Sequence, residues 1–188
     1  QAAAARPDFP QVGFNHDRVG RAMAEHLIAR GHRKLAYVDS GVAEDFRAHE
    51  RGSGFKAAAK AAGASVRLVS APKGEAIASG RLALAALMNG PRASVSAAAF
   101  ANDHLACGAL LEAGARGIKI PGELALMGFG DFPISRQLSP ALTTVSPPRF
   151  EIGRQAAHLL LASFNDGQAA TDCELAWELI ARASTAAV

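Results

Sequence analysis

The sequence contains little of what several classes of function require. Its two cysteines, Cys107 and Cys173, are far apart and lack the paired spacing of thiolate metal sites. No apolar run is long enough to cross a bilayer, and the alanine-rich start lacks the basic and apolar parts of a signal peptide. We therefore expect free buried thiols, no metal and no cofactor, in a cytoplasmic protein without contact to a membrane.

Basic charge is sparse as well. The chain has 20 lysine and arginine residues against 17 aspartate and glutamate residues, a net charge of +3, and no run of four or more basic residues. Surfaces that bind nucleic acid usually carry a concentrated basic patch. Because no helix-turn-helix pattern is present either, we expect no contact between this chain itself and DNA.

Apolar residues are plentiful, at 49% of the chain, and they alternate between strand and helix patterns. Short apolar runs predict strands, helical spacing predicts helices between them, and this alternation is typical of a doubly wound parallel α/β sheet. We expect such a sheet for residues 16–145, with residues 1–15 and 146–180 supplying only part of a second subdomain and residues 181–188 a C-terminal tail. The predicted strands span residues 34–39, 65–70, 97–101, 124–129, 142–145 and 173–180, and the predicted helices 17–30, 44–63, 76–88, 103–117 and 149–165.

Residues 100–131 form the central unit of this pattern, a strand, a helix and a second strand. Asn102 follows the first strand and is a good helix N-cap, Gly117 ends the helix, and Asp131 follows the second strand. Ligands of open parallel sheets bind beyond the carboxyl ends of the strands, so Asn102 and Asp131 could hold a hydroxylated small molecule. Both could equally serve only as caps of helices and turns.

Four segments resemble the LacI/GalR family of transcription regulators. They are ANDHLACGAL from residue 101, GIKIPGELALMGFGD from residue 117, PALTTV from residue 140, and AWELIARAST from residue 176, which is similar to the family's closing L-x-x-R-x-S-T. Within the family, GFGDF followed by PALTTVSPPRFEIG is most similar to regulators of gluconate use. The resemblance implies an effector-binding domain of periplasmic-binding-protein-like fold. It also implies that strand and helix units of the N-terminal subdomain precede residue 1.

The resemblance further implies effector-binding residues. Arg51 begins the segment RGSGF, which matches the family's R-x-x-G-F pattern, whose arginine reaches the effector in the cleft between the subdomains. A guanidinium can bind two hydroxyls or one carboxylate at once. The alternative is a surface arginine paired with Asp45 or Glu50. Lys73 and Glu75 follow the strand at residues 65–70 at the same edge, where they could tune the effector charge or be ordinary loop charges.

An acidic sugar such as gluconate is the expected effector. Arg51 and Lys73 supply positive charge. Many sugar-binding relatives carry an aspartate just before the position of Asp131, where this chain has Gly130. The glycine removes a negative charge and a hydroxyl acceptor, and both changes favour an anionic ligand.

The resemblance also implies partners. We expect a homodimer whose interface includes Leu105, Cys107, Leu111 and Leu138, although an apolar helix face is more often part of a core. Operator DNA would be bound only by a separate N-terminal helix-turn-helix domain, and the effector would shift the population between two settings of the subdomains.

Two other classes of function were weighed. A periplasmic sugar-binding protein of a transport system has the same fold, and only the absent signal and the closing RAST motif favour a regulator. An enzyme is disfavoured because MGFGDF does not match the dinucleotide pattern G-x-G-x-x-G. Asp103, His104 and Cys107 lie within one helical turn, but a thiol nucleophile would need a base and an orienting group, which this spacing does not supply.

Overall fold

The computed structural model describes residues 10–89, 95–165 and 171–186, and its chain divides into two compact units. Unit 1 consists of Gln1–Asn15 and Pro147–Glu178, and unit 2 of His16–Ser146 and Leu179–Val188. Residues 1–9 of the first predicted segment lie outside the described residues.

Unit 2 is built on a parallel sheet. Its strands β2 (Lys34–Asp39), β3 (Ser65–Ser70), β4 (Ala97–Phe100) and β5 (Ala125–Met127) lie in the order β3-β2-β4-β5. The inner strand β4 is buried along its whole length, whereas the edge strand β3 is largely exposed. The fifth predicted strand reaches this sheet only through a bridge between Thr143 and Met127, because the following β6 (Thr144–Ser146) pairs with β8 (Glu178–Ile180).

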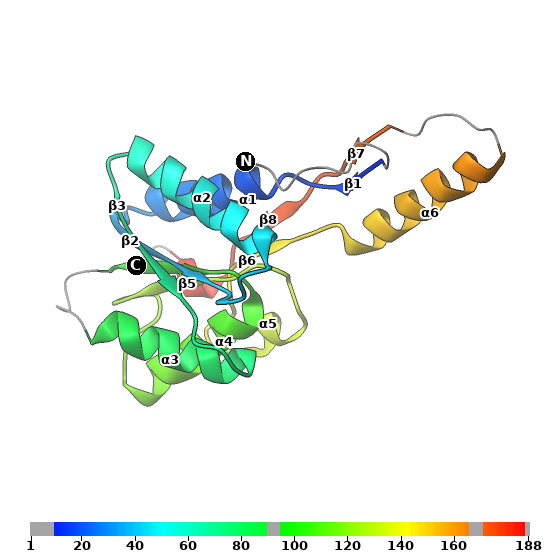
Figure 1. Cartoon of the computed structure of the whole chain (residues 1–188). Coiled ribbons are helices and arrows are strands. Elements are labelled where there is room, and N and C mark those ends of the chain that lie inside the picture. The colour runs from blue at the N-terminus through cyan, green and yellow to red at the C-terminus, as the bar shows by residue number, and fades with distance from the viewer. Residues whose placement is uncertain (1–9, 90–94, 166–170, 187–188) are drawn as a thin grey trace. The chain divides into compact units, whose positions relative to one another are not determined.

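Two pairs of helices cover the sheet of unit 2 (Figure 1). Helices α1 (His16–Ala29) and α2 (Phe46–Ala61) pack together on one face, and α3 (Ala76–Met88) and α4 (Asp103–Ala115) pack together on the other. The predicted doubly wound parallel α/β fold is thereby confirmed. A short helix, α5 (Ile134–Gln137), follows β5.

Glycines set the distance between paired helices. A Cβ atom at Gly20 of α1 would overlap the carbonyl oxygen of Arg51 in α2, and one at Gly54 would overlap the carbonyl oxygen of Asp17. Gly80 and Gly108 have the same role between α3 and α4. The helices therefore approach backbone to backbone, which fixes where the start of α2 lies above the sheet.

The segment after β8 corrects two predictions. Residues 173–180 are not one strand, because β7 (Cys173–Glu174) and β8 belong to different sheets. Residues 181–188 are not a tail either, since Ser184 and Thr185 in the short helix η2 (Ala183–Thr185) are fully buried. The Ser184 hydroxyl donates to the Leu126 carbonyl (2.6 Å) and accepts from the Thr143 amide (2.8 Å). Hydroxyl groups, which an apolar pattern ignores, hold this segment in unit 2.

Unit 1 has a smaller set of elements. Strand β1 (Val12–Gly13) pairs in parallel with β7, and α6 (Arg149–Asn165) contacts β1. Four large apolar side chains of α6 are more than half exposed, namely Phe150, Leu160, Leu161 and Phe164. Within the described residues, no helix of either unit combines the length and apolar character required to span a membrane.

Candidate functional site

The sheet order of unit 2 defines where a ligand would bind. The chain continues from β2 to β3 on one side and from β4 to β5 on the other, so the topology reverses between the neighbouring strands β2 and β4. Doubly wound sheets bind ligands beyond the carboxyl ends of such strands. Val38 pairs with Phe100 at these ends, so the next residues, Asp39 and Ala101, stand at the topological switch point.

Helix α2 brings Arg51 to this point. Its side chain is only 4% exposed, and its Nη2 donates to the Ala101 carbonyl at 2.8 Å. The Cζ atom lies 3.9 Å from the centroid of the Phe129 ring. Arg51 contacts no carboxylate among the described residues, so the alternative of a surface arginine paired with an acid is wrong.

One nitrogen of Arg51 is left without an acceptor. Its Nε is buried and has no hydrogen-bond partner within the described part of the chain. A guanidinium carries five N–H donors, and leaving a buried donor unsatisfied costs about 1–3 kcal/mol. A ligand oxygen would remove that penalty if the atoms that cover this nitrogen moved aside on binding.

His16 was missed by sequence reasoning and supports Arg51 from α1. Its Nδ1 lies 2.9 Å from Nη1 of Arg51, and its ring lies 6.0 Å from the Phe129 ring. Burial, followed by the charges of Arg51 and Arg47, lowers the pKa of His16 to about 4, against a smaller opposing effect of Asp45. Since arginine can only donate, Nδ1 accepts this bond and His16 is neutral at pH 7.

Asn102 adds an amide beside Arg51. It caps α4, with its Oδ1 accepting from the Leu105 amide at 3.0 Å, so the predicted capping role is confirmed. The half-buried side chain follows Ala101 directly, and its amide nitrogen donates to no described residue. Asn102 therefore caps the helix with one end and offers N–H donors with the other.

Asp131 lies in the same region, but its carboxylate is already occupied. Its two oxygens accept from Arg182 and Arg136 respectively, the latter at 2.8 Å, and only 6% of the side chain is exposed. Burial alone would raise the pKa of Asp131, but the hydrogen bonds from Arg182 and Arg136 outweigh it and lower the pKa. The backbone has a positive φ of 49°. Asp131 is thus bonded to two arginines of the chain itself, and its contact with a ligand stays a prediction.

A second aspartate, Asp103, holds the loop that carries Phe129 and Asp131. It is fully buried and accepts from the Phe132 amide (2.9 Å), the Ser135 hydroxyl (2.7 Å) and the Thr144 hydroxyl (2.6 Å). These bonds connect the first turn of α4 to the loop after β5 and to β6. Sequence reasoning did not identify this role of Asp103.

The thiol of that hypothetical site is not activated. Burial, and next the charge of Asp103, raises the pKa of Cys107 to about 11. The thiol is therefore protonated at neutral pH, and a protonated thiol is a poor nucleophile.

Lys73 and Glu75 lie farther along the sheet edge. Their loop follows the edge strand β3, which β2 separates from β4. Glu75 caps α3, and its carboxylate accepts from the amides of Ile77 (3.0 Å) and Ala78 (2.9 Å), which lower its pKa. Lys73 is exposed and makes no ion pair with a described residue. The structure does not bring these two side chains into the Arg51 cluster.

The predicted dimer residues fall into two groups. Leu105 and Cys107 are buried inside unit 2, at 2% and 0% exposure, so they form core and do not offer a surface to a partner. Leu111 is 47% exposed and Leu138 is half-buried. The spacing of apolar residues along a helix does not distinguish a face in the core from a face at an interface, so it could not show that Leu105 and Cys107 are buried.

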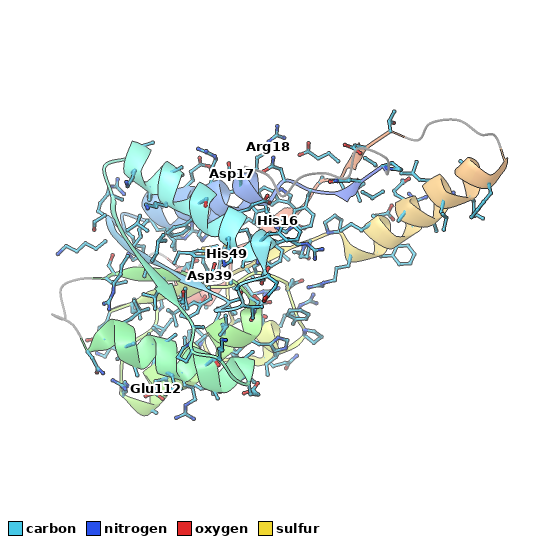
Figure 2. All side chains as sticks on the ribbon, in the orientation of Figure 1. His16, Asp17, Arg18, Asp39, His49 and Glu112 are labelled. Carbon is cyan, nitrogen blue, oxygen red and sulfur yellow. The ribbon has the colours of Figure 1, made fainter. Side chains whose placement is uncertain are left out.

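Asp39 and His49 also lie at the switch point, and the sequence analysis did not select them. The His49 Nε2 is 3.4 Å from the Asp39 Oδ1, and Figure 2 shows the two residues close together. Asp39 ends the predicted strand at residues 34–39, so a charged residue at a strand exit was the available signal.

Metal binding has little support in the described residues, where no three histidine, cysteine, aspartate or glutamate side chains gather. His26 and His32 lie beside hydroxyl groups of distant residues. His26 Nε2 lies 2.8 Å from the Thr185 hydroxyl, and His32 Nδ1 lies 3.1 Å from the Ser96 hydroxyl.

Comparison with known proteins gives consistent matches. Residues 24–185 match the family described as periplasmic binding protein-like domain. The chain is 40% identical over 178 residues to the HTH-type transcriptional regulator GntR of Pseudomonas aeruginosa, covering 93% of this chain and 51% of the relative. It is 29% identical over 187 residues to the HTH-type transcriptional repressor CytR of Escherichia coli K12, covering 96% and 53%. The chain thus spans about half the length of the curated relatives it matches.

Solved structures agree with this match. The transcription regulator GntR from Chromobacterium violaceum has a TM-score of 0.86 and 31% identity, over 96% of this chain and 67% of that one. A LacI family regulator from Enterococcus faecalis with bound ribose has a TM-score of 0.86 over 98% of this chain and 66% of that one; its identity of 24% supports the fold alone.

Proposed function

Because this chain belongs to the periplasmic binding protein-like domain family, in the form found in LacI-family regulators, we propose that unit 2 binds a small sugar or sugar acid as the effector of a transcription regulator. The observation that carries this proposal is the buried guanidinium of Arg51 at the switch point, with an Nε that lacks an acceptor among the described residues.

The chemistry of the cluster favours an acidic ligand. Arg51 and the amide nitrogen of Asn102 are donors, and neutral His16 accepts from Arg51 without cancelling its charge. Charge-assisted bonds from a guanidinium to a carboxylate are stronger than those to a neutral hydroxyl. Gly130 contributes no carboxylate beside this cluster. The relative with 40% identity is named as the regulator GntR of Pseudomonas aeruginosa. These features support gluconate or a similar sugar acid.

The remaining parts of the regulator follow as proposals. DNA would be bound by a helix-turn-helix domain of the kind named in the relatives, in the cytoplasm and without catalysis. Pairing of two chains would use the exposed Leu111 and the neighbourhood of Leu138. A transport-type sugar-binding protein has the same fold, but the relatives at 40% and 29% identity are named as regulators.

Calorimetric titration of the 188-residue chain with D-gluconate, D-glucose, D-ribose and adenine tests this function. We expect gluconate to bind most tightly. Replacing Arg51 by Gln should weaken gluconate binding by about 30-fold or more, because a charge-assisted bond contributes about 2 kcal/mol or more. Arg51→Lys keeps the charge but not the planar fork, so its gluconate affinity should lie between those of the parent chain and of Arg51→Gln.

Arg81→Gln is the matched control, since Arg81 is an exposed arginine of α3 whose carboxylate partner is Glu112. It should leave gluconate affinity unchanged. Circular dichroism establishes that each variant is folded. Tighter binding of adenine than of gluconate would contradict the sugar-acid proposal, and equal gluconate affinity of Arg51→Gln and the parent chain would remove Arg51 from the site.

A further inference from the structure

The Arg51 cluster supplies donors, but a sugar acid also carries hydroxyl groups that need acceptors. Asp131 is less available for this role, because each of its oxygens already accepts from an arginine. We propose that Asp39, held by the turn that follows β2, is the residue of this effector site that accepts the hydroxyl groups and so restricts the ligand to polyhydroxy acids. This inference rests on the function proposed above.

The backbone places Asp39 beside the contact point of Arg51. Val38 pairs with Phe100, and the Ala101 amide donates to the Val38 carbonyl at 2.8 Å. Asp39 is therefore the cross-strand neighbour of Ala101, whose carbonyl accepts from Arg51. Adjacent strands lie about 5 Å apart, which brings the carboxylate and the guanidinium within the span of one small ligand.

The buried phenol of Tyr37 reports on the same arrangement. Its hydroxyl donates to the Ala48 carbonyl at 2.9 Å, and burial raises its pKa well above the ordinary value of 10.0. The charge of Arg51 lowers this pKa and that of Asp39 raises it. Both charged groups therefore lie near the Tyr37 ring.

The bonding of Asp39 is weak and one-sided. Its Oδ1 accepts from the Gly41 amide at 3.3 Å and from the Ser40 hydroxyl at 3.5 Å, and the His49 Nε2 lies 3.4 Å from it. Its Oδ2 has no partner among the described residues, although only 16% of the side chain is exposed. An ionised carboxylate can accept about four hydrogen bonds. Asp39 is therefore a largely buried carboxylate with one oxygen that has no partner in the described part of the chain, whereas each oxygen of Asp131 accepts from an arginine.

The turn after β2 holds the other oxygen in place. The Gly41 amide and the Ser40 hydroxyl both donate to Oδ1 of Asp39, which leaves Oδ2 for a ligand. His49 lies on the first turns of α2, is 49% exposed and has its Nε2 3.4 Å from Oδ1. Helix α2 therefore carries Arg51 and a histidine beside Asp39.

The resulting site has two chemically different ends. Arg51 and Asn102 suit a carboxylate, and Asp39 suits hydroxyl groups on neighbouring carbons. A neutral sugar lacks the anion, and a fatty acid lacks the hydroxyls. A linear acid with several hydroxyl groups satisfies both ends, which selects the aldonic acids as a ligand class.

Asp39→Asn tests the acceptor role without removing the turn, because the Asn oxygen can still accept from the Gly41 amide. We expect calorimetry of the complete chain to show about 10- to 100-fold weaker binding of D-gluconate, as for loss of a hydrogen bond to a charged group. Binding of hexanoate, which has the carboxylate but no hydroxyl groups, should change by less than about twofold. Asp39→Glu, which keeps a carboxylate, should lose less gluconate affinity than Asp39→Asn.

Glu112→Gln is the control. Glu112 lies on α4, well away from Asp39 and His49 in Figure 2, and pairs with Arg81 and Arg116. It should not change either affinity. If the parent chain binds gluconate and Asp39→Asn binds it equally, the inference is overturned and the proposed function stands. If Asp39→Asn weakens gluconate and hexanoate alike, Asp39 is only structural. If the parent chain binds neither sugar nor sugar acid, the proposed function falls and this inference with it.

Discussion

His16 and His26 are two single residues whose charge is set by burial beside arginines. Burial, and then the charge of Arg30, lowers the pKa of His26 to about 4, and burial beside Arg51 and Arg47 does the same for His16. His26 binds Thr185 and His16 binds Arg51, so each neutral ring joins segments that are distant in the sequence. Protonation of either ring opposes the folded state.

The stability of the chain should therefore fall in mild acid. The folded-state pKa of both histidines lies below the ordinary value of 6.5, so the unfolded chain takes up more protons as the pH falls through 6.5. Stability is complete above this pH and is lost progressively toward pH 4. Between pH 7 and pH 5 we expect a loss of about 1 kcal/mol for each histidine after allowance for partial exposure.

Urea unfolding at the two pH values measures this loss. His16→Gln and His26→Gln should each reduce the difference in unfolding free energy between pH 7 and pH 5. His32, whose pKa is also lowered by burial and by Arg30, accounts for part of the remaining slope. A parent chain with equal stability at both pH values would contradict neutral, buried histidines.

At this scale the sequence predicted part of the site. The RGSGF segment indicated Arg51, and the end of a strand indicated Asn102. The bond between Asp131 and Arg182 could not be predicted, because the two residues are 51 positions apart along the chain and meet only in the folded unit. Likewise, no local pattern indicates that His16 contacts Arg51, which is 35 residues away.

Among the elements, the α1 and α2 pair shows how packing positions the site. Arg51 reaches the switch point because α2 lies against α1, where Gly20 faces the Arg51 carbonyl oxygen. The elements themselves could be predicted from apolar periodicity, and the close helix contacts could not. A helical glycine is by itself weak information, since only the folded unit shows which glycines face another backbone.

Gly20→Ala should separate these helices. The added Cβ would overlap backbone atoms of Arg51, which cannot move as a side chain tip can, so we expect a loss of about 2 kcal/mol or more in unfolding free energy. Chemical denaturation measures this loss. Gly114→Ala in α4 is the control, because nothing lies within 4 Å of its Cβ. It should leave stability unchanged or raise it by up to about 1 kcal/mol. Equal stability of the two variants would contradict the close approach of α1 and α2.

For the whole molecule, the residues that hold Arg51 adjoin the places where the chain passes between the units. Unit 2 begins at His16, ends at Ser146 and resumes at Leu179. Arg51 donates to His16 and packs on Phe129. Gly130, which follows Phe129, donates its amide to the Val145 carbonyl at 2.7 Å. Asp131 accepts from Arg182. A ligand that attracts Arg51 therefore acts on residues near all three places where the chain passes between the units. Through these residues an effector could shift the equilibrium between two conformations of the protein.

The most direct measurement of the central claim is an NMR titration of the ¹⁵N-labelled chain with D-gluconate, following the Nε–H signal of Arg51. This nitrogen is buried and without an acceptor in the described part of the chain, so a bound carboxylate should shift its signal strongly, together with the amides of Ala101 and Asn102. The amide of Gly114, at the far end of α4, should not move. An unchanged Arg51 Nε–H signal at a gluconate concentration that saturates binding would contradict the account.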